Sequence, residues 1–370
     1  MMRLLILAPL VALLALAPPA PAAEPAGMKK SEVDEMVNKG LEWLKRQQLS
    51  NGSWTAPGGA HPTTMTALAG VAMLMEGSTL REGKYSDQLV KAVDWFLNNR
   101  QQQSGLLVDP SNPTEGGVHI YGHGFGMLFL ASVYGEEEDT NRRKKLEKAL
   151  KIAVQFSGKA QTDQGGWGYV SAKEGGGFDE GSTTITQMQG LRAARNAGIT
   201  VPKEIIDKGT EYLRKCTTPR GGLIYNLGRG QVPQAGAERP AITAAACACA
   251  FSSGNYEDKY AKMWIKYCKD NIYMKQRGGG LDDYQTYYLA QVIYVLGDDR
   301  YYNLFPDEKP GSGIEWSKYK EDLFAFYKRS QGSDGGWGGG GGWGSGPIFA
   351  TATTLTILQL EKGTLPIYHR

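Results

Sequence analysis

A short motif that recurs along the chain is the feature that most limits its fold. Residues 39–54 read KGLEWLKRQQLSNGSW, with a glutamine, a glycine and a tryptophan at fixed distances after an aromatic–aliphatic pair. The glutamine and tryptophan of the three full copies are Gln48 and Trp54, Gln161 and Trp167, and Gln331 and Trp337. Residues 208–223 (KGTEYLRKCTTPRGGL) keep the frame with Thr217 and Leu223. A motif that keeps its spacing while its residues change indicates an array of structural repeats.

Each motif copy is followed by a second helical segment that is apolar on nearly every side and closes with a glycine. These glycines are Gly77, Gly135, Gly198, Gly254, Gly297 and Gly363. A glycine just past a helical run is a typical helix stop. The segments that carry the motif are amphipathic and need water on one side, whereas the apolar segments need neighbours all round. We therefore predict an all-α fold of six helical hairpins.

Six such hairpins meet both needs if they close into a double barrel, with amphipathic helices outside and apolar helices inside. An open solenoid is the alternative, but it needs polar caps at its ends. The first and last units resemble the middle ones, so we favour closure, with repeats two (AVDWFLNNRQQQSGLL) and five (WIKYCKDNIYMKQRGGGL) degenerate. The glutamine falls at the end of the outer helix, where backbone groups lack partners. We interpret it as a structural clasp between repeats, with its amide on those groups and its flat face against the tryptophan.

The chain begins with the pattern of a secretory signal peptide over residues 1–23. Arg3 precedes an apolar run over 4–17, and Ala20-Pro21-Ala22 is a small-residue cleavage signal. No later apolar run approaches the ~20 residues of a membrane span. We expect an exported protein, periplasmic or extracellular, with one helical domain over 24–370 and no transmembrane segment in the mature chain. The net charge of +3 comes with interleaved signs, so nucleic-acid binding is not expected.

The four cysteines, Cys216, Cys247, Cys249 and Cys268, form no CxxC pair, so they do not predict a structural zinc site. A disulfide between Cys216 and Cys268 stays open, and small buried thiols are the favoured interpretation. We expect no cofactor. A two-histidine metal site from His119 and His123, four residues apart, would need a third ligand from another repeat, and we predict no metal.

The motif resembles the QW repeat of squalene–hopene cyclases and related terpene cyclases. The six hairpins are similar to the α/α toroid that these enzymes share with protein prenyltransferase β-subunits, and the resemblance covers essentially the whole mature chain. It implies an acid segment D-x-D-D-T, for which this chain has DEGST, with Asp179 retained and Gly181 and Ser182 at the proton-donor positions. It also implies a zinc histidine in D-x-Y-H-T, where this chain has Gln285 in DDYQT. Neither the cyclase acid motif nor the zinc triad is intact.

Aligning the apolar segments on their closing glycines puts polar residues in two columns near one mouth of the barrel. The first column holds His123, Thr186, Gln285 and Thr351, and the second holds Thr66, Gln187, Thr243 and Thr286. Helix N-termini add positive potential there. We expect this polar rim to lie over an apolar throat lined by Met65, Phe125, Met127, Met188, Tyr287 and Tyr288. The leading hypothesis is an isoprenoid-like or other lipidic ligand, bound through His123, Thr186, Gln187, Gln285, Tyr287, Tyr288 and Phe125.

The contrasting hypothesis is an enzyme. Its candidate catalytic residues are Asp179, Glu180, Asp282 and Asp283, with His123, in an atypical terpene cyclase or a polysaccharide hydrolase or lyase. Aspartate and threonine at helix starts are also ordinary N-caps. A third hypothesis is therefore a non-catalytic scaffold whose cavity is filled by its own side chains. The contents of the cavity separate the three hypotheses.

Overall fold

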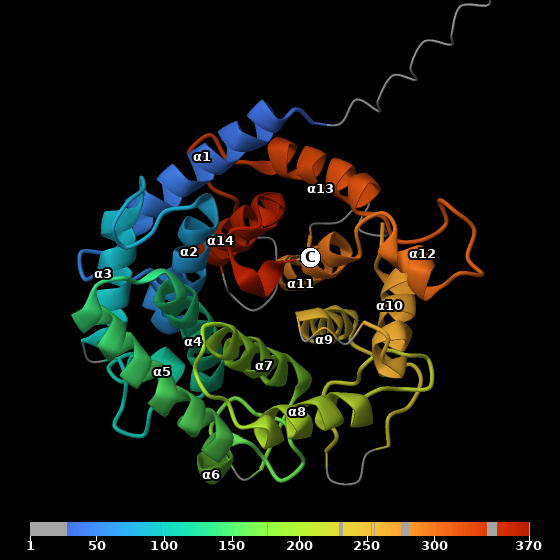
Figure 1. Cartoon of the computed structure of the whole chain (residues 1–370), viewed down its shortest axis with the longest axis horizontal. Coiled ribbons are helices and arrows are strands. Elements are labelled where there is room, and N and C mark those ends of the chain that lie inside the picture. The colour runs from blue at the N-terminus through green and yellow to red at the C-terminus, as the bar shows by residue number, and fades with distance from the viewer. Residues whose placement is uncertain are drawn as a thin grey trace, which may run out of the picture.

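The computed structural model describes residues 28–98, 100–175, 177–228, 232–252, 254, 256–274, 281–338 and 346–369. The predicted signal peptide lies outside these residues. The described residues form helices and connecting turns without a strand, so the all-α prediction is confirmed. Figure 1 shows two concentric rings of helices around one axis.

The helices alternate between the two rings along the chain (Figure 1). The outer ring consists of α1 (Lys30–Gln47), α3 (Ser86–Leu97), α5 (Thr140–Ala160), α8 (Lys203–Lys215), α10 (Lys259–Asn271) and α13 (Trp316–Ser330). The inner ring consists of α2 (Pro62–Glu76), α4 (His119–Glu136), α7 (Gly181–Asn196), α9 (Pro240–Ser252), α11 (Asp283–Leu296) and α14 (Gly346–Leu358). Short helices in the connections are α6 (Ala172–Gly175), α12 (Arg300–Leu304) and the 3₁₀ turns η1 (Pro57–Gly59) and η2 (Pro113–Glu115). Two further 3₁₀ turns, η3 (Leu360–Lys362) and η4 (Pro366–Tyr368), follow α14.

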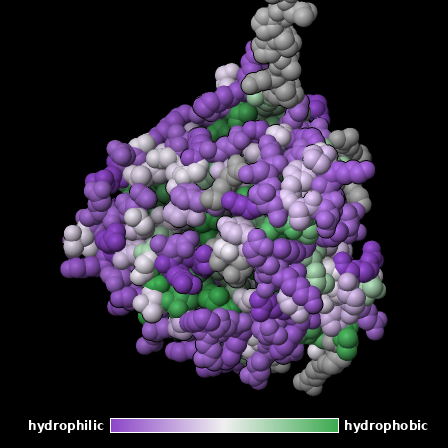
Figure 2. Space-filling view, turned by 45° about the vertical axis from the view of Figure 1, so that its right-hand side comes forward, coloured by the Kyte–Doolittle hydropathy of each residue, from purple (hydrophilic) through white to green (hydrophobic). Residues whose placement is uncertain are grey.

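The inner ring is closed. Each inner helix packs against the next, and the last, α14, packs against the first, α2. Across this joint the Gln359 amide donates to the Ala72 carbonyl at 3.0 Å. Helices α4 and α7 come so close that a Cβ on Gly190 would lie 2.5 Å from the Gly124 carbonyl oxygen. The all-round apolar composition of the inner helices thus reflects neighbours on every side, whereas the surface in Figure 2 is mainly hydrophilic.

The motif glutamine joins neighbouring repeats. Gln48 Nε2 donates to the Gly52 carbonyl of its own loop at 2.9 Å and to the Gln88 carbonyl of the next outer helix at 3.0 Å. The end of its own outer helix is served by the tryptophan instead, because Trp54 Nε1 donates to the Leu44 carbonyl at 2.7 Å. The same three hydrogen bonds recur at Gln161 and Trp167 and at Gln331 and Trp337. The glutamine thus links neighbouring repeats as predicted. The tryptophan indole, and not the glutamine amide, donates to the carbonyl near the end of the outer helix.

Repeat two, which the sequence marks as degenerate, keeps the glutamine contact. Gln101 Nε2 donates to the Gly105 carbonyl at 3.3 Å and to the Ala149 carbonyl of α5 at 2.8 Å. Only the tryptophan is lost, with Leu107 in its place. In repeat four Thr217 replaces the glutamine and accepts from Trp264 Nε1 at 2.9 Å. Residues 275–280 of repeat five lie outside the described residues.

The last glutamine closes the outer ring. Gln331 Nε2 donates to the Met36 carbonyl of α1 at 3.0 Å, and Trp43 Nε1 donates to the Asp334 carboxylate at 2.8 Å. The bond from Gln331 to Met36 repeats the glutamine contact of the internal joints, here between the last and the first outer helix. An open solenoid has no such joint, so closure is established for the described residues.

The structure also bears on the predicted helix stops, the cysteines and the absence of a membrane span. Gly135 lies inside α4, and α14 ends at Leu358, before Gly363, so these two glycines do not stop the helices as the pattern predicted. All four cysteines are buried and unbridged, which fits the interpretation as small buried thiols. No helix among the described residues is long and apolar enough to cross a bilayer.

Removing the closing clasp should destabilise the protein as much as removing an internal one. We expect Gln331→Ala and Gln48→Ala each to lower the free energy of unfolding by about 1–2 kcal/mol, because each removes two hydrogen bonds that join neighbouring repeats. Urea unfolding followed by circular dichroism measures this. Gln47→Ala is the control, because Gln47 is exposed and makes no clasp contact. An unchanged stability in Gln331→Ala alone would contradict a closed ring.

Candidate functional site

Two ends of the inner ring frame the candidate site. We call the end where the inner helices begin the amino mouth, the end where they finish the carboxyl mouth, and the space between them the throat. Residues 364–369, which follow the last inner helix, are called the tail. The predicted acidic residues lie at the amino mouth, whereas the tail lies at the carboxyl mouth.

The acid pair Asp179 and Glu180 is built into the start of α7. Both Glu180 oxygens accept hydrogen bonds from the first turn, one from Ser182 N at 2.7 Å and the other from Thr183 N. Burial raises the pKa of Glu180, and the hydrogen bonds from Ser182 and Thr183 act in the opposite direction. Asp179 is also buried and accepts from Thr162 Oγ1 at 2.7 Å. Both carboxylates are thus engaged in the packing of the motif loop on α7.

The second acid pair, Asp282 and Asp283, begins α11. Asp282 is an N-cap, since its Oδ1 accepts from Gln285 N at 2.9 Å. One oxygen of Asp283 is buried with no hydrogen-bond partner among the described residues. Burial, followed by the charge of Asp282, raises the Asp283 pKa to about 6. Asp283 is therefore the one predicted catalytic residue that has both a shifted pKa and an unused oxygen.

Among the described residues the two acid pairs hydrogen-bond to different groups. Glu180 contacts Tyr121 and its own helix start, while Asp282 caps a different helix. In the described part of the chain no three histidine, cysteine or acidic side chains come together as metal ligands. The catalytic role of the four acids stays a prediction, and the N-cap interpretation accounts for Glu180 and Asp282.

Polar side chains at the amino mouth hold the motif loops against the inner helices. The backbone N–H at the motif tryptophan position donates to a side chain of the following inner helix in five repeats. The acceptors are Thr66, His123, Thr184, Thr243 and Thr351. The sequence alignment on the closing glycines placed four of these five residues in two different columns and did not include Thr184. These side chains are buried, so they do not form an open polar rim.

His123 is the histidine member of that set. Its Nδ1 accepts from Leu107 N at 3.1 Å, and its Nε2 lies 3.1 Å from Ser157 Oγ and 3.2 Å from the Ala153 carbonyl. The imidazole thus joins α4 to the outer helix α5. Both ring nitrogens are engaged in this joint, an arrangement that does not favour a metal shared with His119.

Some of the remaining predicted ligand residues make contacts between helices, and others lie at the throat. Thr186 Oγ1 donates to the Thr183 carbonyl, and Gln187 links Ile120 to Ser157. Gln285 is half-buried at the amino mouth. Phe125 is buried. Met188 packs beside Gly209 of the outer helix α8, and the Met127 sulfur lies 3.8 Å from Ser157 Oγ of the outer helix α5. Both methionines therefore face the outer ring and not the throat. Tyr287 and Tyr288 form part of the throat wall.

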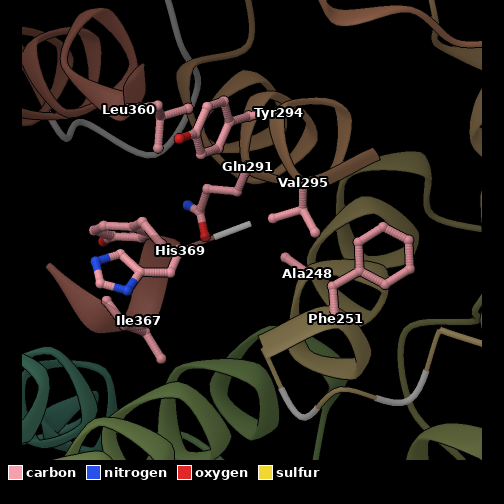
Figure 3. Close-up of a pocket in the computed structure, with 9 residues that line it drawn as sticks. Ala248, Phe251, Gln291, Tyr294, Val295, Leu360, Ile367 and His369 are labelled. Atoms are coloured by element: carbon pink, nitrogen blue, oxygen red, sulfur yellow. The ribbon is translucent and has the colours of Figure 1, made fainter. Parts of the chain in front are cut away.

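The throat is occupied by the protein itself. The tail turns back toward the ring axis, where Figure 1 places the C-terminus. Tyr368 is 2% exposed, and its hydroxyl lies 2.7 Å from the Tyr287 hydroxyl. Thr364 Oγ1 fixes the start of the tail on the Met75 carbonyl at 2.9 Å. Between the tail and helices α9 and α11 there remains a cavity of about 10 Å³, the space of one water molecule (Figure 3).

A column of tyrosines connects the tail to the amino mouth. Tyr284 and Tyr288 make an edge contact at 4.8 Å between ring centres, Tyr288 and Tyr287 another at 5.0 Å, and Tyr287 reaches Tyr368. The hydroxyls of Tyr284 and Tyr288 are buried without a well-formed hydrogen bond to any described residue. Burial is the largest cause that raises the pKa of both. The throat wall therefore carries two neutral hydroxyls that lack a good partner.

The aromatic rim of the amino mouth was missed in the sequence. Tyr121 stacks on Tyr169 at 6.0 Å, Tyr169 packs against the exposed Phe178, and the Tyr169 hydroxyl meets that of Tyr225. A signal was available, because Tyr169 and Tyr225 each stand two residues after the motif position, Trp167 and Leu223.

No protein-family model and no curated protein matches the chain. Solved structures do match in shape. The type II terpene cyclase MstE from Scytonema, in complex with geranylgeranyl dihydroxybenzoate, shares 14% identity with a TM-score of 0.56, over 90% of this chain and 98% of that one. The α-1,6-mannanase GH76A of Salegentibacter sp. HEL1_6 shares 10%, with a TM-score of 0.61 over 88% and 98%. A D-mannose isomerase shares 11%, with a TM-score of 0.62 over 92% and 100%.

This chain is an α/α toroid. The likenesses extend over nearly the full length of the compared chains, but at these identities they show the fold alone. The names of the three proteins give them a geranylgeranyl dihydroxybenzoate, a mannan and a sugar as substrates, so the toroid does not select one chemistry. Function has to be argued from the throat and its tail.

The neutral state of His123 should make stability depend on pH. Burial lowers the His123 pKa from 6.5 to about 3. Protonation below pH 6.5 therefore favours the unfolded chain, so this stability is complete above pH 6.5 and is lost as the pH falls toward 3. We expect the free energy of unfolding to fall more steeply in wild type than in His123→Thr, by up to about 1.4 kcal/mol per pH unit. Parallel urea-unfolding profiles of the two proteins would contradict this.

Proposed function

We propose that the throat binds an elongated, mostly apolar ligand with a hydroxyl-bearing head, in competition with the protein's own tail. The observation that carries the proposal is the tail itself. Ile367 and Tyr368 are buried at the throat, and the tip of Tyr368 places a phenol hydroxyl against Tyr287. A ligand that takes this place needs the same chemistry, an apolar body with a hydroxyl near Tyr287.

The wall of the throat suits such a ligand. Ala248, Phe251 and Val295 supply apolar surface beside the tail (Figure 3). Gln291, whose amide oxygen accepts from Gln189, and the hydroxyls of Tyr284 and Tyr288 supply the polar groups. Similarity to a terpene cyclase that holds geranylgeranyl dihydroxybenzoate, an isoprenoid with a hydroxylated aromatic head, supports an isoprenoid-like ligand. Binding sites of this kind are mostly apolar with a few placed polar groups.

The proposal is binding without turnover. Glu180 and Asp282 cap helices, and the carboxylate that acts on Asp283 is its chain neighbour Asp282, which is engaged as the cap of α11. Protonating an alkene or cleaving a glycosidic bond needs a positioned acid together with a partner group. Ligand binding with the acids in structural roles fits these contacts better than the atypical cyclase or the polysaccharide enzyme.

A permanent scaffold is the second candidate. The small residual cavity and the hydrogen bond from Thr364 to Met75 favour it, because both hold the tail in place. Burial of Ile367 and Tyr368 contributes about 3–5 kcal/mol to the seated tail. A ligand that displaces the tail must overcome that free energy, so its apparent affinity is reduced about a hundredfold to several thousandfold.

Removal of the tail separates the two candidates. We expect a chain ending at Gly363 to bind geranylgeraniol at least about a hundredfold more tightly than the full chain, measured by equilibrium dialysis. The double variant Ile367→Asp/Tyr368→Asp keeps the chain length and should behave like the truncation. Tyr368→Phe is the matched control, because it removes only the hydroxyl contact to Tyr287.

The outcomes are distinct. Tight binding by both tail variants supports a tail-gated throat. Folded tail variants, as judged by circular dichroism, that bind no better than the full chain would overturn ligand binding and leave the scaffold.

A further inference from the structure

The repeats provide an internal comparison on the outside of the ring. An aromatic side chain occupies the same outer-helix position in successive repeats, namely Trp43, Trp95, Phe156 and Tyr212. These positions are equivalent in space. In each case the loop glycine of the preceding repeat packs against the backbone carbonyl of the residue four positions before the aromatic residue. These pairs are Gly335 on Lys39, Gly52 on Lys91, Gly105 on Ile152 and Gly165 on Lys208.

At the joint between the last and first repeats this aromatic residue binds a carboxylate. Trp43 Nε1 donates to Asp334 Oδ2 at 2.8 Å, and Arg46 donates to the Asp334 backbone carbonyl. The hydrogen bond from Trp43 is the largest cause that lowers the Asp334 pKa. Asp334 stands three residues after its motif glutamine, Gln331. The joint therefore uses an indole N–H as a donor to an anionic oxygen.

The next joint has the indole without the carboxylate. Asn51, three residues after Gln48, takes the place of Asp334, and its Oδ1 accepts from Ser53 N at 3.0 Å and Ser53 Oγ at 2.8 Å. Trp95 is 6% exposed, and its buried Nε1 has no hydrogen-bond partner among the described residues. An indole N–H buried without a partner is costly, so a missing acceptor is indicated.

A groove lies at this joint. It has a volume of about 330 Å³ and is lined by Asn51, Lys91, Asp94, Trp95 and Arg100 among others. Arg100 lies 5.1 Å from the Trp95 ring centre and forms an ion pair with Asp109 at 3.2 Å. Lys91 is exposed on the groove wall, whereas Arg100 is already paired with Asp109 and Asp94 lies in the same wall. The groove thus offers one lysine ammonium beside an indole donor.

We propose that this groove binds the carboxylate of a small organic acid, with Trp95 Nε1 as donor and Lys91 as the cation. The bound carboxylate takes the position that Asp334 holds at Trp43. Nε1 is buried, so a ligand reaches it only when an exposed lining side chain such as Ser50 or Asn51 moves aside. The site lies on the outer ring, away from the throat, and is independent of the function proposed above.

The test follows the Trp95 indole resonance in ¹⁵N-labelled full-length protein, assigned with Trp95→Phe. Phe156 occupies the same position in repeat three, so phenylalanine suits the fold there. We expect acetate to shift the Trp95 resonance saturably while Trp43, already bonded to Asp334, does not respond. Acetamide at equal ionic strength is the uncharged control. D-glucuronate and the capped aspartate N-acetyl-Asp-amide then separate a sugar acid from an amino-acid side chain.

Asn51→Asp supplies the missing carboxylate from within the chain. We expect its Trp95 resonance to lie near the acetate-bound position without ligand, and its affinity for acetate to fall by about tenfold or more. The unfolding temperature should rise. The proposal is overturned if acetate and acetamide have equal effects, if neither moves the Trp95 resonance, or if Asn51→Asp responds to acetate as wild type does.

Discussion

Each clasped joint of the ring depends on one glutamine amide that donates to two backbone carbonyls at once. One carbonyl belongs to its own loop, and the other lies within the next outer helix, where it already serves that helix. A carbonyl oxygen has two lone pairs, so the amide adds a bond without breaking the helix. Because both acceptors are backbone atoms, the surrounding side chains are free to differ between repeats. This explains how repeat two keeps its joint after losing the tryptophan.

The ring was predictable from sequence because its signals are periodic. Helical amphipathicity, the spacing from Gln48 to Trp54 and the return of both at Gln331 and Trp337 follow from geometry that every hairpin shares. The register inside the inner helices was not predictable from the glycines. The distance from the acceptor side chain to the closing glycine varies, from 11 residues between Thr66 and Gly77 to 14 between Thr184 and Gly198. An alignment on helix ends therefore drifts by a turn.

The tail escaped prediction for another reason. Residues 364–369 read TLPIYH, a stretch too short and irregular to show a helical period, and only its position on the ring axis gives it meaning. Glu180 and Asp282 were predicted as catalytic acids from the sequence. In the structure both accept hydrogen bonds from the first backbone N–H groups of an inner helix, which need acceptors. The sequence singled out Tyr287 and Tyr288 of the throat wall but not the tail or the aromatic rim, because the positions of those depend on loops that no periodicity fixes.

Closure of the ring also governs the order in which the chain acquires its structure. The bond from Gln331 to Met36 joins residues 295 positions apart, and α2 obtains one of its two inner neighbours only from α14. During synthesis on the ribosome, five hairpins emerge while one side of α2 still lacks its partner and remains an apolar surface. Such high contact order slows the final step. Assembly thus ends with the two extremities meeting, and a nascent chain of this design depends on chaperones, or on rapid completion, to keep that open seam from aggregating.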